Sequence, residues 1–289
     1  MFLCRVEALG TLANLAADRE GALAIDHEDH ATTRLFAMVK CEDPVVQELA
    51  MKTLVCIAKE SRAIRSAMRN SPNVPYLLTF LQRQDTASAC RASILSTLCY
   101  LVEDTACRDC VVASSELLKF LTSLLEKPTR IEEKQSILRI MAGIAELPDT
   151  KALMVQDGSL LSTLVKCLEP GSGLGNDRIQ ECAAETISKL VDMTPVDTNI
   201  QLMLSRLGMM PFLVNLVNSK NDKTAHFAAI TLGILSRSTP QLIVQQSVSK
   251  RLLANIGMQR YVHLPPPSQL KMLGKHNYHS FDQNYLNDA

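Results

Sequence analysis

The sequence predicts an all-α protein in which short helices stack into one elongated solenoid. Three observations predict this class. An apolar pattern of eight residues recurs six times along the 289-residue chain. The recurrences are spaced at a nearly constant interval, which is the signature of a repeat architecture. Hydrophobic residues make up 47% of the chain, whereas aromatic residues make up 4% and Trp is absent. The core is therefore aliphatic, as expected for short helices that bury narrow faces on their neighbours.

The recurring octet places apolar residues at positions i, i+1, i+4 and i+7, which share one face of a helix. The fifth position of each octet marks the repeat, and successive marks lie 42, 44, 43, 46 and 45 residues apart. Such a period is typical of helical solenoids with units of about 40–47 residues. The six marks are Leu12, Leu54, Leu98, Met141, Ile187 and Leu232. Thr precedes the mark in five of the six octets, which we attribute to tight helix packing rather than to binding.

One repeat shows the expected helices in order. The sequence predicts a short helix over 61–69, a second over 74–81 and a long third helix over 86–102. A short apolar segment before each second helix favours three helices per unit over the two of HEAT or tetratricopeptide arrays. The preceding long helix has a defined start, because Asp43 suits the N-cap and Pro44 the first helical position. Its predicted buried stripe is Val45, Val46, Leu49, Ala50, Thr53, Leu54 and Ile57.

The repeats divide the chain into an array and a tail. We expect the array to span 1–248 and to start in the third helix of an incomplete first repeat. Without the two preceding helices, the leucines of that first octet would be partly uncovered. This is expected either of a shortened reading frame or of an end that docks another domain. Residues 249–262 are expected to form a capping helix, and 263–289, which lack periodicity, a disordered tail.

The amino-acid sequences of two predicted long helices resemble the armadillo repeat family. The segments are Glu42–Ala50 and Arg178–Ala184. The resemblance covers residues 3 to about 240 and implies a right-handed α-solenoid, or superhelix, of five to six three-helix repeats. The arrangement is also loosely similar to the armadillo region of plant U-box ubiquitin ligases.

The resemblance implies that the third helices line a concave groove. In nuclear-import adaptors of this family, a Trp and an Asn four residues apart hold an extended basic peptide there. The Trp position here holds Gly10, Lys52, Ser96, Arg139, Glu185 and Ile230. The Asn position holds Asn14, Cys56, Tyr100, Gly143, Lys189 and Ile234. Only Asn14 matches, so import-signal recognition is not expected.

The same positions predict a protein-binding groove of mixed character. Its candidate residues are Asn14, Lys52, Tyr100, Arg139 and Lys189. We expect the three cations to face acidic residues of a partner and Tyr100 to serve as an aromatic anchor, a residue type enriched at binding hot spots. The alternative is that all five are ordinary exposed positions of amphipathic helices.

No group of residues predicts catalysis, a metal or a cofactor. Cys107 and Cys110 form a lone CxxC in a short first helix, whereas structural zinc needs four ligands. The polar segment 26–30 contains two His and three acids but reads as a loop whose Asp29 or His30 caps the following helix. The Gly-rich segment 171–175 lacks the Lys-Ser/Thr of a phosphate-binding loop. The sequence therefore predicts no enzyme, no metal and no cofactor.

Charge and cysteine content bear on partners and compartment. Thirty Lys and Arg balance thirty Asp and Glu, and no basic block occurs, so a nucleic-acid partner is not expected. Nine Cys scattered through apolar helices indicate a reducing compartment. No signal peptide and no apolar stretch of about 18 residues is found. We expect a cytoplasmic protein without a transmembrane segment, with the nucleus or the membrane periphery left open.

These observations predict a non-catalytic scaffold that binds a partner peptide or helix on the concave face. The alternative is the substrate-binding armadillo portion of a U-box-type ubiquitin ligase whose catalytic-recruitment domain is absent from this chain. An importin-like carrier is disfavoured by the missing Trp and Asn residues. The sequence does not name the partner.

Overall fold

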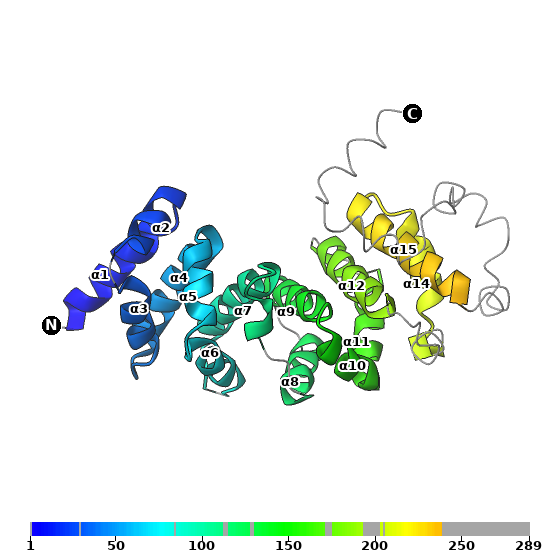
Figure 1. Cartoon of the computed structure of the whole chain (residues 1–289), viewed down its shortest axis with the longest axis horizontal. Helices are drawn as coiled ribbons and strands as arrows, with labels where there is room; N and C mark the ends of the chain where they lie inside the picture. The colour runs from blue at the N-terminus through cyan, green and yellow to red at the C-terminus, as the bar shows by residue number, and fades with distance from the viewer. Residues whose placement is uncertain are drawn as a thin grey trace, which may run out of the picture. The chain divides into compact units, whose positions relative to one another are not determined.

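The protein is described by a computed structural model (Figure 1). It describes residues 2–238 except 29, 84, 112–114, 128–129, 171–174, 193–202 and 205. These residues form fourteen α-helices and one short 3-10 helix, and no strand occurs among them, so the all-α prediction is confirmed. The chain divides into two compact units, Met1–Leu190 and Val191–Ala289. The expected capping helix at 249–262 and the tail at 263–289 lie outside the described residues.

The first unit repeats one order of helices: a short first helix, a second helix and a long third helix. The first helices are α2 (Arg19–Asp26), α5 (Arg62–Arg69), the 3-10 helix η1 (Arg108–Cys110) and α10 (Pro148–Gln156). The second helices are α3 (Ala31–Val39), α6 (Asn73–Gln82), α8 (Ser115–Glu126) and α11 (Gly158–Lys166). The third helices are α1 (Phe2–Leu15), α4 (Pro44–Glu60), α7 (Ser88–Glu103), α9 (Ile131–Ile144) and α12 (Asn176–Val191). Three helices per repeat, rather than two, are thus confirmed.

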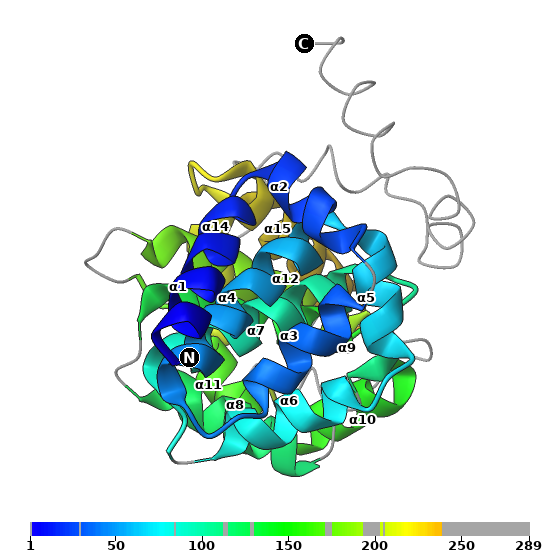
Figure 2. The same ribbon diagram turned by 90° about the vertical axis from the view of Figure 1, so that its left-hand side faces the viewer.

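The third helices of this unit stack side by side. Helix α1 packs on α4, α4 on α7, and α7 on α9. The hydroxyl of Thr186 in α12 donates to the carbonyl of Leu138 in α9 at 3.3 Å, which continues the stack. Figure 2 looks along it, with α1, α4 and α7 one behind the other. The second helices α3, α6 and α8 pack against α4, α7 and α9 and form a separate row in Figure 1.

Helix α4 shows why the sequence fixes a helix start. The Asp43 carboxylate accepts hydrogen bonds from the backbone N–H of Val45 at 2.8 Å and of Val46 at 3.0 Å. These bonds satisfy amides that have no partner within the helix, and Pro44 at the first helical position has no amide to satisfy. The predicted stripe is largely buried. The exceptions are Leu49, which is half-buried, and Val45, whose exposed fraction is 50%.

The Thr that recurs in the octets of this chain has a packing explanation. Thr53, Thr97, Thr186 and Thr231 are completely buried. Each hydroxyl donates to the carbonyl four residues earlier, at 2.8–2.9 Å. A buried hydroxyl satisfied by its own helix adds a small side chain to an apolar interface without an unpaired polar group. The prediction that Thr recurs for tight packing is consistent with these contacts.

The second unit is described in two helices, α14 (Met209–Val217) and α15 (Asp222–Ser238), which pack on each other. The side chain of Asn221 caps α15 by accepting from the backbone N–H of Lys223 at 3.0 Å and of Thr224 at 3.3 Å. Gly208 precedes α14 with a φ of 74°, a left-handed conformation that glycine adopts at little cost. In both units, none of the described helices is long and apolar enough to cross a membrane.

Candidate functional site: the ladder face of the third helices

The predicted groove residues all lie on third helices of the first unit. Asn14 is exposed near the end of α1, Lys52 is exposed on α4 and Arg139 is exposed on α9. Tyr100 on α7 and Lys189 on α12 are half-buried. We call the surface that carries these five residues the ladder face. The buried stripe of each third helix faces its neighbours, whereas these five residues are exposed or half-buried.

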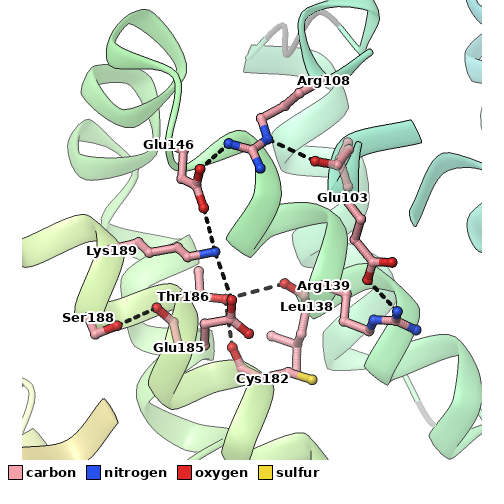
Figure 3. Close-up of polar contacts among 11 residues, drawn as sticks. Glu103, Arg108, Leu138, Arg139, Glu146, Cys182, Glu185, Thr186, Ser188 and Lys189 are labelled. Atoms are coloured by element: carbon pink, nitrogen blue, oxygen red, sulfur yellow. Dashed lines mark hydrogen bonds and ion pairs between the residues drawn. The ribbon is translucent and has the colours of Figure 1, made fainter. Parts of the chain in front are cut away.

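On the ladder face, ion pairs join three successive third helices, α7, α9 and α12 (Figure 3). Glu103 at the end of α7 pairs with Arg139 of α9. Lys189 of α12 pairs with Glu146, just beyond α9, at 2.8 Å and with Glu185 of its own helix at 2.7 Å. The stacking of α7, α9 and α12 therefore places two sets of ion pairs on this face, which we together call the charged network.

The network changes the expectation for the cations. Arg139 and Lys189 were expected to face acids of a partner, but the structure supplies carboxylates from the chain itself. Burial lowers the pKa of Lys189, yet the charges of Glu185 and Glu146 and their hydrogen bonds outweigh burial, and the pKa is raised. The Lys189 ammonium group therefore stays protonated and paired with these two carboxylates. Of the three predicted cations, Lys52 alone makes no ion pair or side-chain hydrogen bond within the described part of the chain.

Gly143 gives a structural reason for one missing Asn of the import-adaptor pattern. It is buried in α9 against α7, and a Cβ atom built on it would lie 2.8 Å from Cβ of Val102. Real Cβ contacts are longer than this. A side chain at this rung would push α9 away from α7, so an amide that clamps a peptide cannot be placed here.

Tyr100 lines a recess of about 540 Å³ at the end of α7. The recess is also lined by Lys59 and Arg62, at the α4–α5 junction, and by Glu103 and Asp104 at the α7 end. Burial raises the pKa of Tyr100, while the nearby charges of Lys59 and Arg139 oppose this rise. The phenol is therefore protonated at neutral pH and lies near cations from two neighbouring repeats.

Two arginine bridges, Arg65 and Arg108, tie the ends of successive third helices together. Arg65 of α5 donates to the carbonyl of Ala58 in α4 at 2.8 Å and to Asp104 at 3.0 Å. Arg108 of η1 repeats this arrangement by donating to the carbonyl of Val102 in α7 at 2.8 Å and pairing with Glu146. Carbonyls in the last turn of a helix lack partners within it and carry the negative end of the helix dipole. Each guanidinium satisfies them and holds the next carboxylate in place.

Sequence reasoning missed the residues at the helix ends. Lys59, Glu103 and Glu146 lie one turn beyond the Trp and Asn positions that guided the prediction. The sequence signal that could have found these residues is a charged residue five to seven positions after each repeat mark. Asn14 and Lys52 make no described hydrogen bond or ion pair with the other predicted residues, whereas Arg139 and Lys189 belong to the network of Figure 3. Binding of a partner by the five predicted groove residues remains a prediction.

The residues that could bind a metal either make hydrogen bonds with other groups or lie too far apart to share an ion. Among the described residues, no group of three or more His, Cys, Asp or Glu is placed to hold a metal ion. The Asp26 carboxylate accepts from the Ser61 hydroxyl at 2.5 Å. Of the two expected capping residues, His30 occupies the N-cap position of α3 with a φ of 62°, but its side chain makes no capping hydrogen bond, and Asp29 lies outside the described residues.

The two Cys of the CxxC lie at the two ends of η1, so the short first helix expected there is a single 3-10 turn. Cys107 is buried and Cys110 is half-buried. Burial raises the pKa of the Cys107 thiol and raises that of Cys110 to about 11. Both thiols are therefore protonated at neutral pH, which disfavours nucleophilic or redox chemistry at this pair.

Comparisons with known proteins identify the fold. No protein-family model matches the chain, and no curated protein matches it. A computationally designed armadillo repeat protein for modular peptide recognition superposes with a TM-score of 0.63 and 18% identity, over 79% of this chain and 92% of its own. A second designed armadillo repeat protein gives a TM-score of 0.62 at 17% identity, over 80% and 92%.

A third designed armadillo repeat protein, solved in complex with the peptide (KR)4, gives a TM-score of 0.61 at 18% identity, over 79% of this chain and 92% of its own. These similarities extend along most of both chains in each pair. At such low identity they establish architecture rather than activity. The chain therefore has the fold of an armadillo-type α-solenoid.

Proposed function

We propose that the protein is a non-catalytic interaction scaffold that binds a peptide or helix of a partner along the ladder face. The observation that carries this proposal is the register of the third helices. The ion pairs Glu103–Arg139 and Glu146–Lys189 join α7, α9 and α12 on the ladder face, and the exposed Lys52 lies on α4, the preceding third helix. Ion-paired side chains are already ordered, so the scaffold would lose less conformational entropy when a partner binds.

The fold supports the same proposal. A designed protein of this fold holds a (KR)4 peptide, and another was designed for modular peptide recognition. The mixed charge of the ladder face differs from the Trp and Asn pattern expected of basic-peptide carriers. The ubiquitin-ligase alternative would use the same face for substrate, and no described residue favours it over a free-standing scaffold. Cytoplasmic localisation remains a prediction.

The test selects dodecapeptides displayed on phage against the full chain and measures their affinity by fluorescence anisotropy. We expect Tyr100→Ala and Lys52→Glu each to weaken binding at least tenfold. The matched control is Tyr76→Ala, because Tyr76 is also half-buried but lies on the second helix α6. Hydrogen exchange should show protection of α4, α7 and α9 on binding. Failure to select any peptide, or protection confined to the second helices, would contradict the proposal.

A further inference from the structure

The recess beside Tyr100 is a small polar site within the ladder face. Its walls come from the end of α4, the start of α5 and the end of α7. The recess volume, about 540 Å³, falls in the range of small-molecule sites, about 300–1,000 Å³. Three cations, Lys59, Arg62 and Arg65, two carboxylates and Tyr100 line it. The site is therefore built from charged groups rather than apolar ones.

The carboxylates of the recess are already neutralised by the chain. Asp104 accepts from Arg65 at 3.0 Å and pairs with Arg62 at 3.7 Å. Glu103 pairs with Arg139. Burial opposes ionisation of Asp104, but the hydrogen bonds and positive charges around it lower its pKa. Neither acid is left to attract a cation from a partner.

The cations around the recess outnumber the acids. Lys59, Arg62 and Arg65 line the recess against Glu103 and Asp104. Outside this lining, Glu60 pairs with Lys59 at 3.0 Å and with Arg19 at 3.7 Å. Five cations thus share three carboxylates, and two positive charges are left over. The cations are Arg19, Lys59, Arg62, Arg65 and Arg139, and the carboxylates are Glu60, Glu103 and Asp104.

Three groups keep hydrogens that they can donate to a ligand, although Lys59 and Arg62 each also pair with one carboxylate. The side chain of Arg62 is 74% exposed and that of Lys59 is 59% exposed, so both ammonium and guanidinium hydrogens face solvent. The Tyr100 hydroxyl makes no described hydrogen bond. A protonated phenol between two cations donates to an anion, and charge-assisted hydrogen bonds of this kind are the stronger ones. Arg65, by contrast, is 17% exposed and fully used by its bridge.

We propose that this recess is an anion subsite that receives one acidic side chain of the bound peptide, a carboxylate or a phosphate monoester, through Lys59, Arg62 and the Tyr100 hydroxyl. This inference rests on the proposed function, because the recess opens on the same face. It gives the partner a chemical character: an acidic residue is required at the position that reaches the end of α7.

The direct test uses side-chain analogues and needs no partner peptide. The full chain is labelled with tyrosine carrying ¹³C at the ε positions, and the ring signals are followed during titration with N-acetylglutamate, N-acetyl-O-phosphoserine or N-acetylglutamine. Each probe has its α-carboxyl group blocked as the methylamide, so that only the side chain can carry charge. We expect saturable shifts of the Tyr100 signal with one or both anions and none with N-acetylglutamine. Comparison of the two anions distinguishes a carboxylate from a phosphate preference. The signal of Tyr76, outside the recess, should not move.

Variants separate the recess from non-specific attraction. Lys59→Met combined with Arg62→Met should weaken the anion affinity at least fivefold, whereas Lys119→Met, an exposed cation on α8, should leave it unchanged. A Tyr100 signal that does not move, that moves equally with N-acetylglutamine, or that keeps its response in the double variant would overturn the subsite. If anions bind here but no peptide is selected by phage display, the scaffold proposal fails and the subsite stands. If peptides bind without any preference for acids, the subsite alone fails.

Discussion

Gly143 of α9 and Val102 of α7 approach so closely that no side chain fits between the two helices. A Cβ atom added to Gly143 would lie 2.8 Å from both Cβ and Cγ2 of Val102. We expect Gly143→Ala to lower the free energy of unfolding by about 1 kcal/mol. Overpacking of about 1–3 kcal/mol outweighs the gain of about 1 kcal/mol that Ala brings to a helix interior. Urea unfolding followed by circular dichroism measures the difference.

Gly10 is the matched control for this substitution. It lies in α1, and a Cβ atom built on it has no other atom within 4 Å. Gly10→Ala should therefore raise stability by up to about 1 kcal/mol. A stabilising Gly143→Ala would contradict the close approach of α9 and α7.

The two arginines that share Asp104 should differ sharply in their contribution to stability. We expect Arg65→Met to cost about 3 kcal/mol, because it leaves Asp104, which is 7% exposed, and the carbonyl of Ala58 without their main donor. Arg62→Met should cost less than about 1 kcal/mol, because the Arg62 side chain is 74% exposed and lies 3.7 Å from the carboxylate. Denaturant unfolding of both variants tests this, and equal losses would contradict it.

Stability should fall on acidification through two carboxylates. The pKa values of Asp104 and Glu146 are lowered, because Arg65 at the first and Lys189 and Arg108 at the second outweigh the opposing effect of burial. A lowered folded-state pKa stabilises the protein above the unfolded value, about 4, and this contribution is lost as pH falls through the folded value. Urea unfolding between pH 7 and pH 3 should show the decline.

The variant Asp104→Asn with Glu146→Gln should be less stable at pH 7 and lose less stability on acidification. Glu132→Gln, which removes an exposed carboxylate of α9, should follow the wild-type curve. If the double variant declines as steeply as the wild type, these two groups do not carry the pH dependence.

Two buried thiols should resist alkylation in the folded protein. Burial raises the pKa of Cys99 and of Cys182 to about 12. Because the thiolate is the reactive form, iodoacetamide at pH 8 should modify them at least about 100-fold more slowly than the half-buried Cys41. Peptide mass spectrometry resolves the sites. In guanidinium all three should react at similar rates, and fast reaction of Cys99 in the folded state would contradict its burial.

Local features of the fold were predictable because their causes are local. The Asp43 cap, the Pro44 start and the apolar pattern of each octet depend on residues within one helix, and the structure confirms the helix order they imply. The 3-10 turn at η1 was not predictable from the same apolar pattern. There, the Arg108 side chain reaches the carbonyl of Val102 and Glu146, contacts that periodicity does not encode.

The helices that carry the candidate residues were predictable, but the contacts of those residues were not. Counting from the repeat marks placed Tyr100, Arg139 and Lys189 on third helices, where the structure has them. Their charge partners, Glu103 and Glu146, lie 36 and 43 residues away in the chain, and only the stacking of α7, α9 and α12 brings them together. The positive charge near Tyr100 arises where α4 and α5 meet the end of α7, which periodicity does not encode either.

The arginine bridges also bear on how the first unit flexes. Arg65 and Arg108 tie neighbouring third helices at their C-terminal ends with charged contacts. At the opposite ends, the Ser88 hydroxyl donates to Glu133 at 3.2 Å between α7 and α9, a contact without a cation. Bending should therefore open the N-terminal ends of these helices and pivot at the bridged edge. Tyr100 and Glu103 lie near that pivot, so the anion subsite would keep its shape while the rest of the ladder face adjusts its curvature to a partner.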